Sequence, residues 1–176
     1  MKAAIYYGPG DVRVEKVPDP KAGPYGMVVK VKVCGICPVV DLLAWKKQWN
    51  GAGLAMGHEY SGEVVEVGSK VRSLVKEGDR VYAYAYAPCH RCPSCLEGDY
   101  WRCQNWMMGL DKHGAMAEYY HVPFVTRQSF VKAPPEVDDH ELAMVEPVHL
   151  SCFLQVGIPH YCKIFSPAPV GKIRLI

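Results

Sequence analysis

The sequence lacks any long hydrophobic run, any strong excess of charge of one sign and any internal repeat. No apolar stretch approaches the roughly 20 residues needed to cross a bilayer, so a membrane-spanning protein is not expected. The 20 basic and 18 acidic side chains are mixed along the chain, and a net charge of +2 gives no long-range field to recruit nucleic acid or an anionic membrane surface. We therefore predict neither nucleic acid nor a membrane as a partner.

The opening residues, MKAAIYYGPG, also lack the basic stretch and apolar run of a secretory signal. An oxidising compartment is therefore not supported, and the expected location is the cytoplasm. The length of 176 residues favours one well-buried domain over two. Eight cysteines are many for idle thiols, and in a reducing compartment they favour metal binding over disulfides.

Four of the cysteines lie within the stretch CHRCPSCLEGDYWRC, residues 89–103, which we name the cysteine lobe. Four thiolates at such short spacings can surround one Zn²⁺ in a closed tetrahedron, a geometry that suits a structural ion. An iron–sulfur cluster also takes four cysteines, but the usual cluster-binding spacings differ from this one. Free reduced thiols are the remaining alternative. We predict a structural zinc whose ligands are Cys89, Cys92, Cys95 and Cys103.

Short runs of β-branched and aromatic residues, separated by turn residues, predict a mainly β chain. The expected strands are MKAAIYY, VRVEKV, MVVKVKVCG, SGEVVEVG, RVYAYAYA, GAMAEYYHVP and SFVKAP. Several of them alternate apolar and polar residues, as half-buried strands do. Strands at this spacing indicate an all-β barrel or sandwich.

Two helices are expected to interrupt the strands. The first covers about residues 39–48, and its apolar side is formed by Leu42, Leu43 and Trp45. The second begins after Asp138 as N-cap, with Glu141 completing a capping box. Pro147 would lose a hydrogen bond inside a helix, so a kink or a break is predicted there.

A second set of metal-binding residue types lies in GHEYSGEVVEVGSKV, where His58 and Glu59 are adjacent. A metal that acts on a substrate takes fewer protein ligands and keeps an open position. Adjacent residues of an extended strand point to opposite faces, so both can bind one ion only if the backbone turns. Gly57 permits such a turn. Taken alone, a His-Glu pair fits an ordinary polar loop equally well.

Together these motifs resemble the zinc-dependent medium-chain dehydrogenases, which include alcohol, polyol, threonine and glucose dehydrogenases. Residues 57–71 match the family signature G-H-E-x-x-G-x5-G-x-x-V at every fixed position, and the cysteine lobe has the family's structural-zinc spacing. VKVCGIC, residues 31–37, resembles the segment whose second cysteine binds the catalytic zinc, and VEPV, residues 145–148, resembles the family's Glu-Pro step. The resemblance covers residues 1 to about 150.

The resemblance implies a GroES-like β-barrel with a few short helices and a structural-zinc lobe, formed by residues 1–150 as a zinc-binding catalytic domain. Residues 151–176 are expected to be a C-terminal tail or the truncated start of a Rossmann domain. The cofactor-binding turn G-x-G-x-x-G does not occur here, so NAD(P) is expected only if a nucleotide-binding domain is supplied. The family segments that complete the barrel are expected to be missing too, which favours self-association or a partner chain.

The resemblance also implies a catalytic zinc bound by Cys37 and His58. Glu59 or Glu146 would be the third or exchanging ligand, and an open position would let the ion polarise an alcohol or carbonyl oxygen. Glu59 and Asp41 are the expected catalytic residues. The implied function is oxidation of a hydroxyl group of a small alcohol or polyol to a carbonyl, with hydride passing to NAD(P).

One position departs from the family pattern. Family members usually have Ser or Thr two residues after the cysteine ligand, where the hydroxyl passes the substrate proton toward solvent, but this chain has Val39. Asp41 is either the family's nearby aspartate displaced by one residue or a new polar group. Two alternatives stay open: a non-enzymatic zinc-binding module with a vestigial active site, and zinc-assisted hydration or hydrolysis without a nucleotide.

Overall fold

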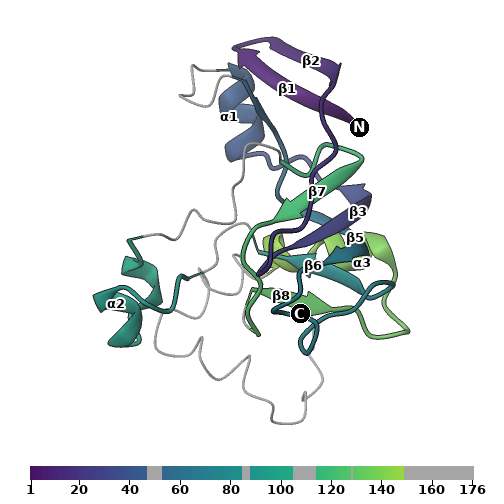
Figure 1. Ribbon diagram of the computed structural model, residues 1–176. Helices are drawn as coiled ribbons and strands as arrows, with labels where there is room; N and C mark the ends of the chain where they lie inside the picture. Colours follow the sequence, from purple (N-terminus) through teal and green to yellow (C-terminus); the bar gives the residue numbers. More distant parts are fainter. Residues whose placement is uncertain (47–52, 85–87, 105–113, 128, 149–176) are drawn as a thin grey trace, which may run out of the picture. The chain divides into compact units, whose positions relative to one another are not determined.

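The computed structural model describes residues 1–46, 53–84, 88–104, 114–127 and 129–148 (Figure 1). The expected tail at 151–176 and the last residues of the helix expected at 39–48 lie outside these ranges. The chain divides into two compact units, Met1–Val145 and Glu146–Ile176. None of the helices in the described ranges is both long enough and apolar enough to cross a membrane.

The described residues form eight β-strands, which confirms the mainly β fold. They are β1 (Lys2–Gly8), β2 (Asp11–Lys16), β3 (Met27–Cys34), β4 (Leu54–Ala55), β5 (Tyr60–Val67), β6 (Arg80–Ala83), β7 (Tyr119–Val122) and β8 (Phe130–Lys132). A three-stranded sheet has the order β2-β1-β4, and a five-stranded sheet has the order β7-β3-β5-β6-β8 (Figure 1). Each strand pair is antiparallel.

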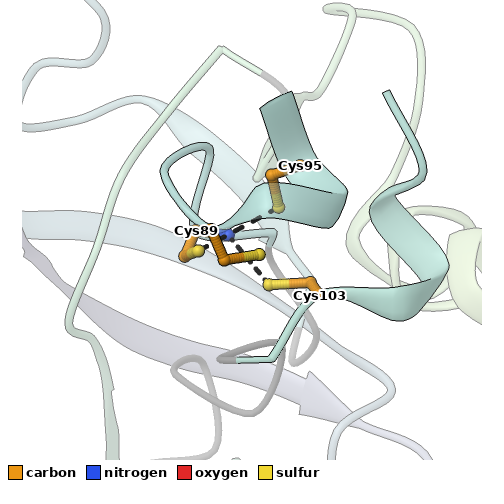
Figure 2. A group of neighbouring side chains, drawn as sticks. Cys89, Cys95 and Cys103 are labelled. Carbon is orange, nitrogen blue, oxygen red and sulfur yellow. Dashed lines mark hydrogen bonds between the residues drawn. The ribbon is translucent and has the colours of Figure 1, made fainter. Parts of the chain in front are cut away.

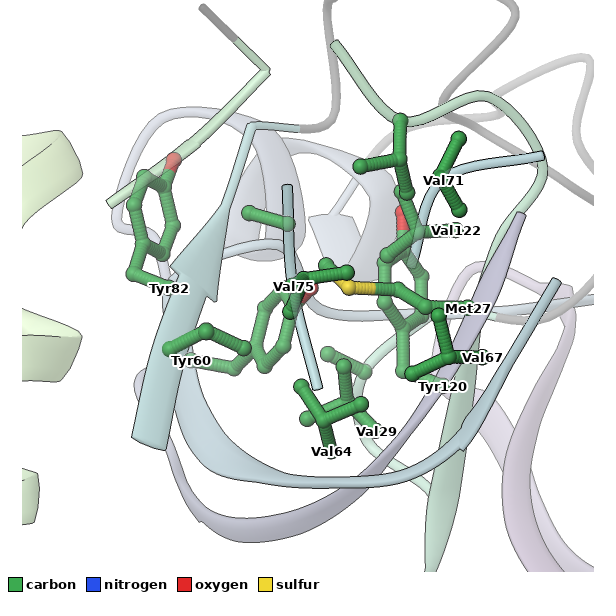
Figure 3. Close-up of a cluster of buried hydrophobic side chains, with 14 of the residues drawn as sticks. Met27, Val29, Tyr60, Val64, Val67, Val71, Val75, Tyr82, Tyr120 and Val122 are labelled. Carbon is green, nitrogen blue, oxygen red and sulfur yellow. The ribbon is translucent and has the colours of Figure 1, made fainter. Parts of the chain in front are cut away.

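The main core packs against the five-stranded sheet. Figure 3 shows its principal members, which are Met27, Val29, Tyr60, Val64, Val67, Val71, Val75, Tyr82, Tyr120 and Val122. The Tyr60 ring lies 4.7 Å from the Tyr120 ring and 5.8 Å from the Tyr82 ring, measured between centroids, and both pairs are tilted. Because aromatic pairs favour such offset arrangements, Tyr60 is held firmly in the core. The residues just before Tyr60 in sequence are therefore fixed to a rigid strand.

Helix α3 (Asp139–Ala143) begins as the sequence predicts. The Asp138 carboxylate accepts the Glu141 backbone N–H at 2.8 Å, and the Glu141 carboxylate accepts the Asp138 backbone N–H at 3.0 Å. The expected capping box is thus confirmed. Leu142 is fully buried in the main core, so α3 covers part of that core.

The interruption after α3 falls earlier than expected. A turn at Met144 separates α3 from a helical stretch at 145–148, and Pro147 lies within that stretch. Proline is tolerated in the first turn of a helix, because its missing N–H would have no intrahelical acceptor there. The break therefore occurs at Met144, three residues before Pro147, and the prediction of a kink at Pro147 itself stays a prediction.

Helix α1 (Val40–Lys46) lies at the expected place, but its orientation differs from the one predicted. Its buried residues are Asp41 and Ala44. The side chains expected to form the apolar, inward side are instead 40%, 48% and 46% exposed; they are Leu42, Leu43 and Trp45. Hydrophobic periodicity therefore misassigned the face of this helix.

Two contacts explain why α1 buries the face that carries Asp41 and Ala44. The Asp41 carboxylate accepts the Cys37 backbone N–H at 2.8 Å, which draws a charged side chain into the protein. Ala44 packs in a small cluster with Tyr6 of β1 and Met56. The hydrogen bond from Cys37 and the packing against β1 both require α1 to turn Asp41 and Ala44 inward. Together these contacts outweigh the burial of the larger side chains.

Candidate metal centres

The cysteine lobe contains two short helical turns, α2 (Pro93–Leu96) and the 3-10 turn η1 (Tyr100–Arg102). The sulfur atoms of its four cysteines all lie within 4.8 Å of one another, and all four residues are buried. Figure 2 shows Cys89, Cys95 and Cys103 gathered together, with the Cys89 and Cys95 sulfurs 4.0 Å apart. Four sulfurs at about 2.3 Å from one zinc would lie ~3.8 Å from each other, so this donor set fits a tetrahedral ion.

The backbone of the cysteine lobe also favours sulfur ligands. Backbone hydrogen bonds from Gln104 and Cys95 lower the pKa of the Cys92 thiol. Burial raises the pKa of Cys95 to about 12, because a thiolate without a cation is costly away from water. Pro93 starts α2 directly after Cys92, at a helix position where no N–H is needed. A cation bound among the sulfurs would offset this cost at Cys95.

A second group, which we name the Cys37 site, consists of Cys37, His58 and Glu59. One ligand atom from each lies within 4.8 Å of the others, and the three residues are 8%, 6% and 8% exposed. Cys37 follows β3, whereas His58 and Glu59 precede β5. The two segments meet because β3 and β5 are antiparallel neighbours, with Cys34 opposite Tyr60. Thiolate, imidazole and carboxylate are the donor types of a three-ligand zinc site that keeps an open position.

Glycines on both segments permit this approach. Gly57 has φ +92°, so the expected turn before His58 is confirmed. A β-carbon at Gly57 would lie 2.8 Å from the Cys34 sulfur and 2.8 Å from the Met116 backbone nitrogen. The Gly35 N–H donates to the Glu59 carbonyl at 2.6 Å, and a β-carbon at Gly35 would lie 2.7 Å from the Glu59 carboxylate. Sequence reasoning did not anticipate Gly35, because only the β3–β5 pairing brings it beside Glu59.

Backbone N–H groups just after Cys37 donate to its sulfur. The Val40 N–H donates to this sulfur at 3.4 Å. Burial raises the pKa of the Cys37 thiol, while the hydrogen bonds from the Val40 and Val39 backbone oppose that rise. Donors aimed at the sulfur stabilise its ionised form, which is the form that binds a metal. Val39 itself is 63% exposed and occupies the position where the family usually has a hydroxyl side chain.

Cys34 differs from Cys37, although only two residues separate them. Burial, together with the charges of Asp41 and Glu59, raises the pKa of Cys34 to about 12. Its thiol donates to the Gly35 carbonyl at 3.5 Å. Cys34 is therefore a neutral thiol that packs beside the Cys37 site.

Asp41 contacts the Cys37 backbone, whereas Glu146 lies at the start of the second compact unit. Asp41 is 4% exposed and braces the loop that carries Cys37, accepting the Cys37 N–H and donating its own N–H to the Cys37 carbonyl at 3.1 Å. Its expected part in catalysis stays a prediction. Glu146 begins the second compact unit, so its expected part as a ligand also stays a prediction.

Comparison with known proteins identifies the domain. Residues 23–135 match the family model for the alcohol dehydrogenase GroES-like domain. The chain belongs to this family. The GroES-like β-barrel expected from the resemblance is thereby confirmed, as is membership of the zinc-dependent medium-chain dehydrogenases.

Named relatives in the family agree on the broad class. The chain is 31% identical to sorbitol dehydrogenase of Halalkalibacterium halodurans, over 98% of this chain and 52% of the relative. It is 40% identical to L-threonine 3-dehydrogenase of Symbiobacterium thermophilum, over 66% of this chain and 34% of the relative. The crystal structure of 2R,3R-butanediol dehydrogenase from Bacillus subtilis superposes with a TM-score of 0.72 at 31% identity, over 86% of this chain and 46% of that one. The chain thus spans about half the length of the sorbitol dehydrogenase, and it has the catalytic-domain fold of the family.

Proposed function

We propose that this chain is the zinc-binding catalytic domain of a dehydrogenase that oxidises a hydroxyl group to a carbonyl. The observation that carries the proposal is the convergence of Cys37, His58 and Glu59 within 4.8 Å in a buried site of the family's barrel. The names of the relatives support the reaction class, since sorbitol, L-threonine and butanediol dehydrogenases are all named for hydroxylated substrates.

The residues of the Cys37 site have different proposed roles. Cys37 and His58 would hold the zinc, and Glu59 would be the third or exchanging ligand. The bound ion would supply Lewis acidity toward an alcohol or carbonyl oxygen. Because Val39 has no hydroxyl, the Glu59 carboxylate is the proposed acceptor of the substrate proton. Asp41 would position Cys37 through the 2.8 Å hydrogen bond to its backbone.

The reaction also needs a hydride acceptor, because zinc does not exchange electrons here. We assign that part to NAD(P) on a nucleotide-binding domain, in keeping with a sorbitol dehydrogenase relative about twice as long as the matched region. The cysteine lobe would hold a second, structural zinc with all four positions filled by sulfur. The proposed catalytic domain at residues 1–150 ends close to the boundary of the unit Met1–Val145.

A second candidate is a non-enzymatic zinc module that keeps the fold and the cysteine lobe. Val39 favours it, because an exposed valine replaces the hydroxyl that the family uses to move a proton. The two candidates differ at the Cys37 site: the dehydrogenase domain must bind an ion there, whereas the module need not.

Metal analysis separates these candidates. We expect two zinc ions per wild-type chain, and one ion in each of the variants Cys37→Ser and His58→Ala. Cys34→Ser is the matched control, since it removes a neighbouring thiol that is not a proposed ligand and should keep both ions. A wild-type chain with one zinc, or a Cys37→Ser chain that keeps two, would show that the Cys37 site is vestigial and would favour the non-enzymatic module.

A further inference from the structure

In the described part of the chain, strand β2 has a neighbouring strand on one side only. The three-stranded sheet has the order β2-β1-β4, so β2 lies at one end of that sheet (Figure 1). With six residues, β2 is longer than each of the other described strands that end a sheet, which are β4, β7 and β8. An open edge of this length presents backbone N–H and C=O groups that can pair with a strand of another molecule.

The side chains of β2 carry two charges of each sign. Asp11 and Glu15 are acidic, whereas Arg13 and Lys16 are basic. The Arg13 side chain is 59% exposed and Val14 is 75% exposed, so both are accessible to a partner. Charges often protect an edge strand against pairing, so the order of the signs decides whether β2 repels or attracts a copy of itself.

The order of the charges favours one way of pairing two β2 strands. A two-fold axis between the strands makes them antiparallel and keeps each side chain on its own face of the joined sheet. With the axis at Val14, Arg13 of each chain lies opposite Glu15 of the other. With the axis at Arg13 or at Glu15, like charges would lie directly opposite each other, which is destabilising. An axis at Val12 would pair only the first half of β2, from Asp11 to Arg13.

The two charged residues that would meet are already positioned on one face of β2. Arg13 donates two hydrogen bonds to the Asp11 carboxylate, at 2.8 and 2.7 Å, and its guanidinium carbon lies 4.6 Å from the centre of the Tyr7 ring. The Tyr7 hydroxyl donates to the Glu15 carboxylate at 3.1 Å. Because these contacts restrict Arg13 and Glu15 before any partner binds, less side-chain entropy is lost on pairing.

We propose that β2 is an interaction surface for a second copy of this chain, with the two β2 strands antiparallel about a two-fold axis at Val14. The partner is assigned by charge, because residues 12–16 of β2 are complementary to the same residues of a copy in this register. The inference does not depend on the proposed function. Two short strands are expected to bury less than the roughly 1,000 Å² of a stable interface, so the dimer should be weak and should form at high protein concentration.

Cysteine cross-linking tests the register. Val14→Cys places two thiols at the axis, where opposed β-carbons of an antiparallel pair lie about 4.5–5.5 Å apart. Lys16→Cys is the matched control on the same strand, because its two thiols would be separated by four residues of strand, or roughly 13 Å. In oxidised glutathione, the covalent dimer should form about tenfold faster from Val14→Cys than from Lys16→Cys.

The native cysteines must not contribute to the cross-linking. Every variant therefore also carries Cys152→Ser and Cys162→Ser, which remove the two cysteines outside the described residues. The other six cysteines are buried or partly buried. The chain with only these two substitutions measures their background.

Exchange of the charges tests what holds the pair together. In the Val14→Cys chain, Arg13→Glu places acidic side chains opposite each other, and Glu15→Arg places basic side chains opposite each other. Each variant alone should lose most of the cross-linking. An equimolar mixture of the two should recover it, because every acidic side chain at these positions then lies opposite a basic one. Mixing does not repair a misfolded chain, so recovery reports on the charge pairing.

Three results would overturn the inference. The first is cross-linking of Lys16→Cys as fast as that of Val14→Cys, which would mean a different register or random collision. The second is a mixture of the two charge variants that cross-links as slowly as either variant alone. The third is a 176-residue chain that sediments as a monomer up to a concentration of roughly 1 mM, which excludes even a weak dimer.

Discussion

Two glycines of the family signature, Gly57 and Gly62, keep backbone segments close together. Gly57 combines φ +92° with contacts that leave no room for a side chain. A β-carbon at Gly62 would collide with the Lys30 carbonyl oxygen on the neighbouring strand β3. These glycines, which lie on either side of His58 and Glu59, therefore allow β3 to lie close to β5. The Cys37 site depends on that close approach.

The steric role of Gly57 can be separated from its backbone conformation. Gly10 also has a positive φ, +73°, but a β-carbon there would meet no atom within 4 Å. We expect Gly10→Ala to cost about 1–2 kcal/mol of unfolding free energy from its conformation alone. Gly57→Ala should cost roughly 1–3 kcal/mol more, because Met116 and Cys34 must move. Urea unfolding measures both, and equal losses would show that these neighbours give way freely.

Asp41 offers a test of positioning at the residue scale. Asp41→Ala removes the acceptor of the Cys37 N–H and should weaken metal binding at the Cys37 site by roughly 10–100-fold, as loss of a supporting contact does elsewhere. Asp41→Asn keeps a side-chain oxygen and should stay within about threefold of wild type if the hydrogen bond is what matters. Chelator competition gives the affinities. Equal weakening in both variants would mean that the negative charge, rather than the hydrogen bond, supports the site.

The four ligands in the cysteine lobe could be predicted from residue type and spacing, whereas Cys37, His58 and Glu59 were predicted from motifs that resemble those of the family. Their supporting contacts could not. Gly35 approaches Glu59 through strand pairing, and the Val40 N–H reaches the Cys37 sulfur through the first turn of a helix. Such contacts depend on the three-dimensional path of the backbone, which a linear motif does not contain.

For the helices, too, features that arise from local contacts could be predicted, whereas features that arise from tertiary contacts could not. The start of α3 was predictable, since the Asp138 and Glu141 hydrogen bonds join residues three positions apart. The face that α1 buries was not, because Asp41 and Ala44 turn inward through contacts with the Cys37 loop and β1. Propensity and periodicity thus located both helices, and tertiary contacts decided their orientation.

Helix α3 should contribute strongly to the stability of the barrel. Leu142 is fully buried in the main core, so Leu142→Ala should lower the free energy of unfolding by about 2–5 kcal/mol. Met144→Ala is the control from the same region; Met144 is 52% exposed, and its truncation should change stability by less than about 0.5 kcal/mol. Denaturant unfolding measures the difference. A loss below about 1 kcal/mol for Leu142→Ala would mean that α3 is not part of the cooperative core.

On the scale of the whole molecule, two kinds of core coexist. The main core consists mostly of aliphatic and aromatic side chains that pack on the five-stranded sheet, whereas the buried cluster of the cysteine lobe, among the residues that the structure describes, consists of its four cysteines. Four thiols bury little apolar surface, so the structural zinc that we propose would supply much of the stability of the lobe. Structural zinc contributes on the order of 10 kcal/mol in small peptides, which is enough to fold such a segment.

The barrel and the cysteine lobe should therefore respond differently to loss of metal. We expect a strong chelator, or Cys103→Ser, to abolish hydrogen-exchange protection in residues 89–103 while β3 and β5 keep theirs, because the main core contains no metal ligand from the lobe. Cys34→Ser, which removes a thiol outside the lobe, should leave the exchange of residues 89–103 unchanged. Peptide-resolved mass spectrometry reads both regions in one sample. Equal loss of protection in β3 and β5 would contradict this division, since it would make the ion a condition for folding the barrel itself.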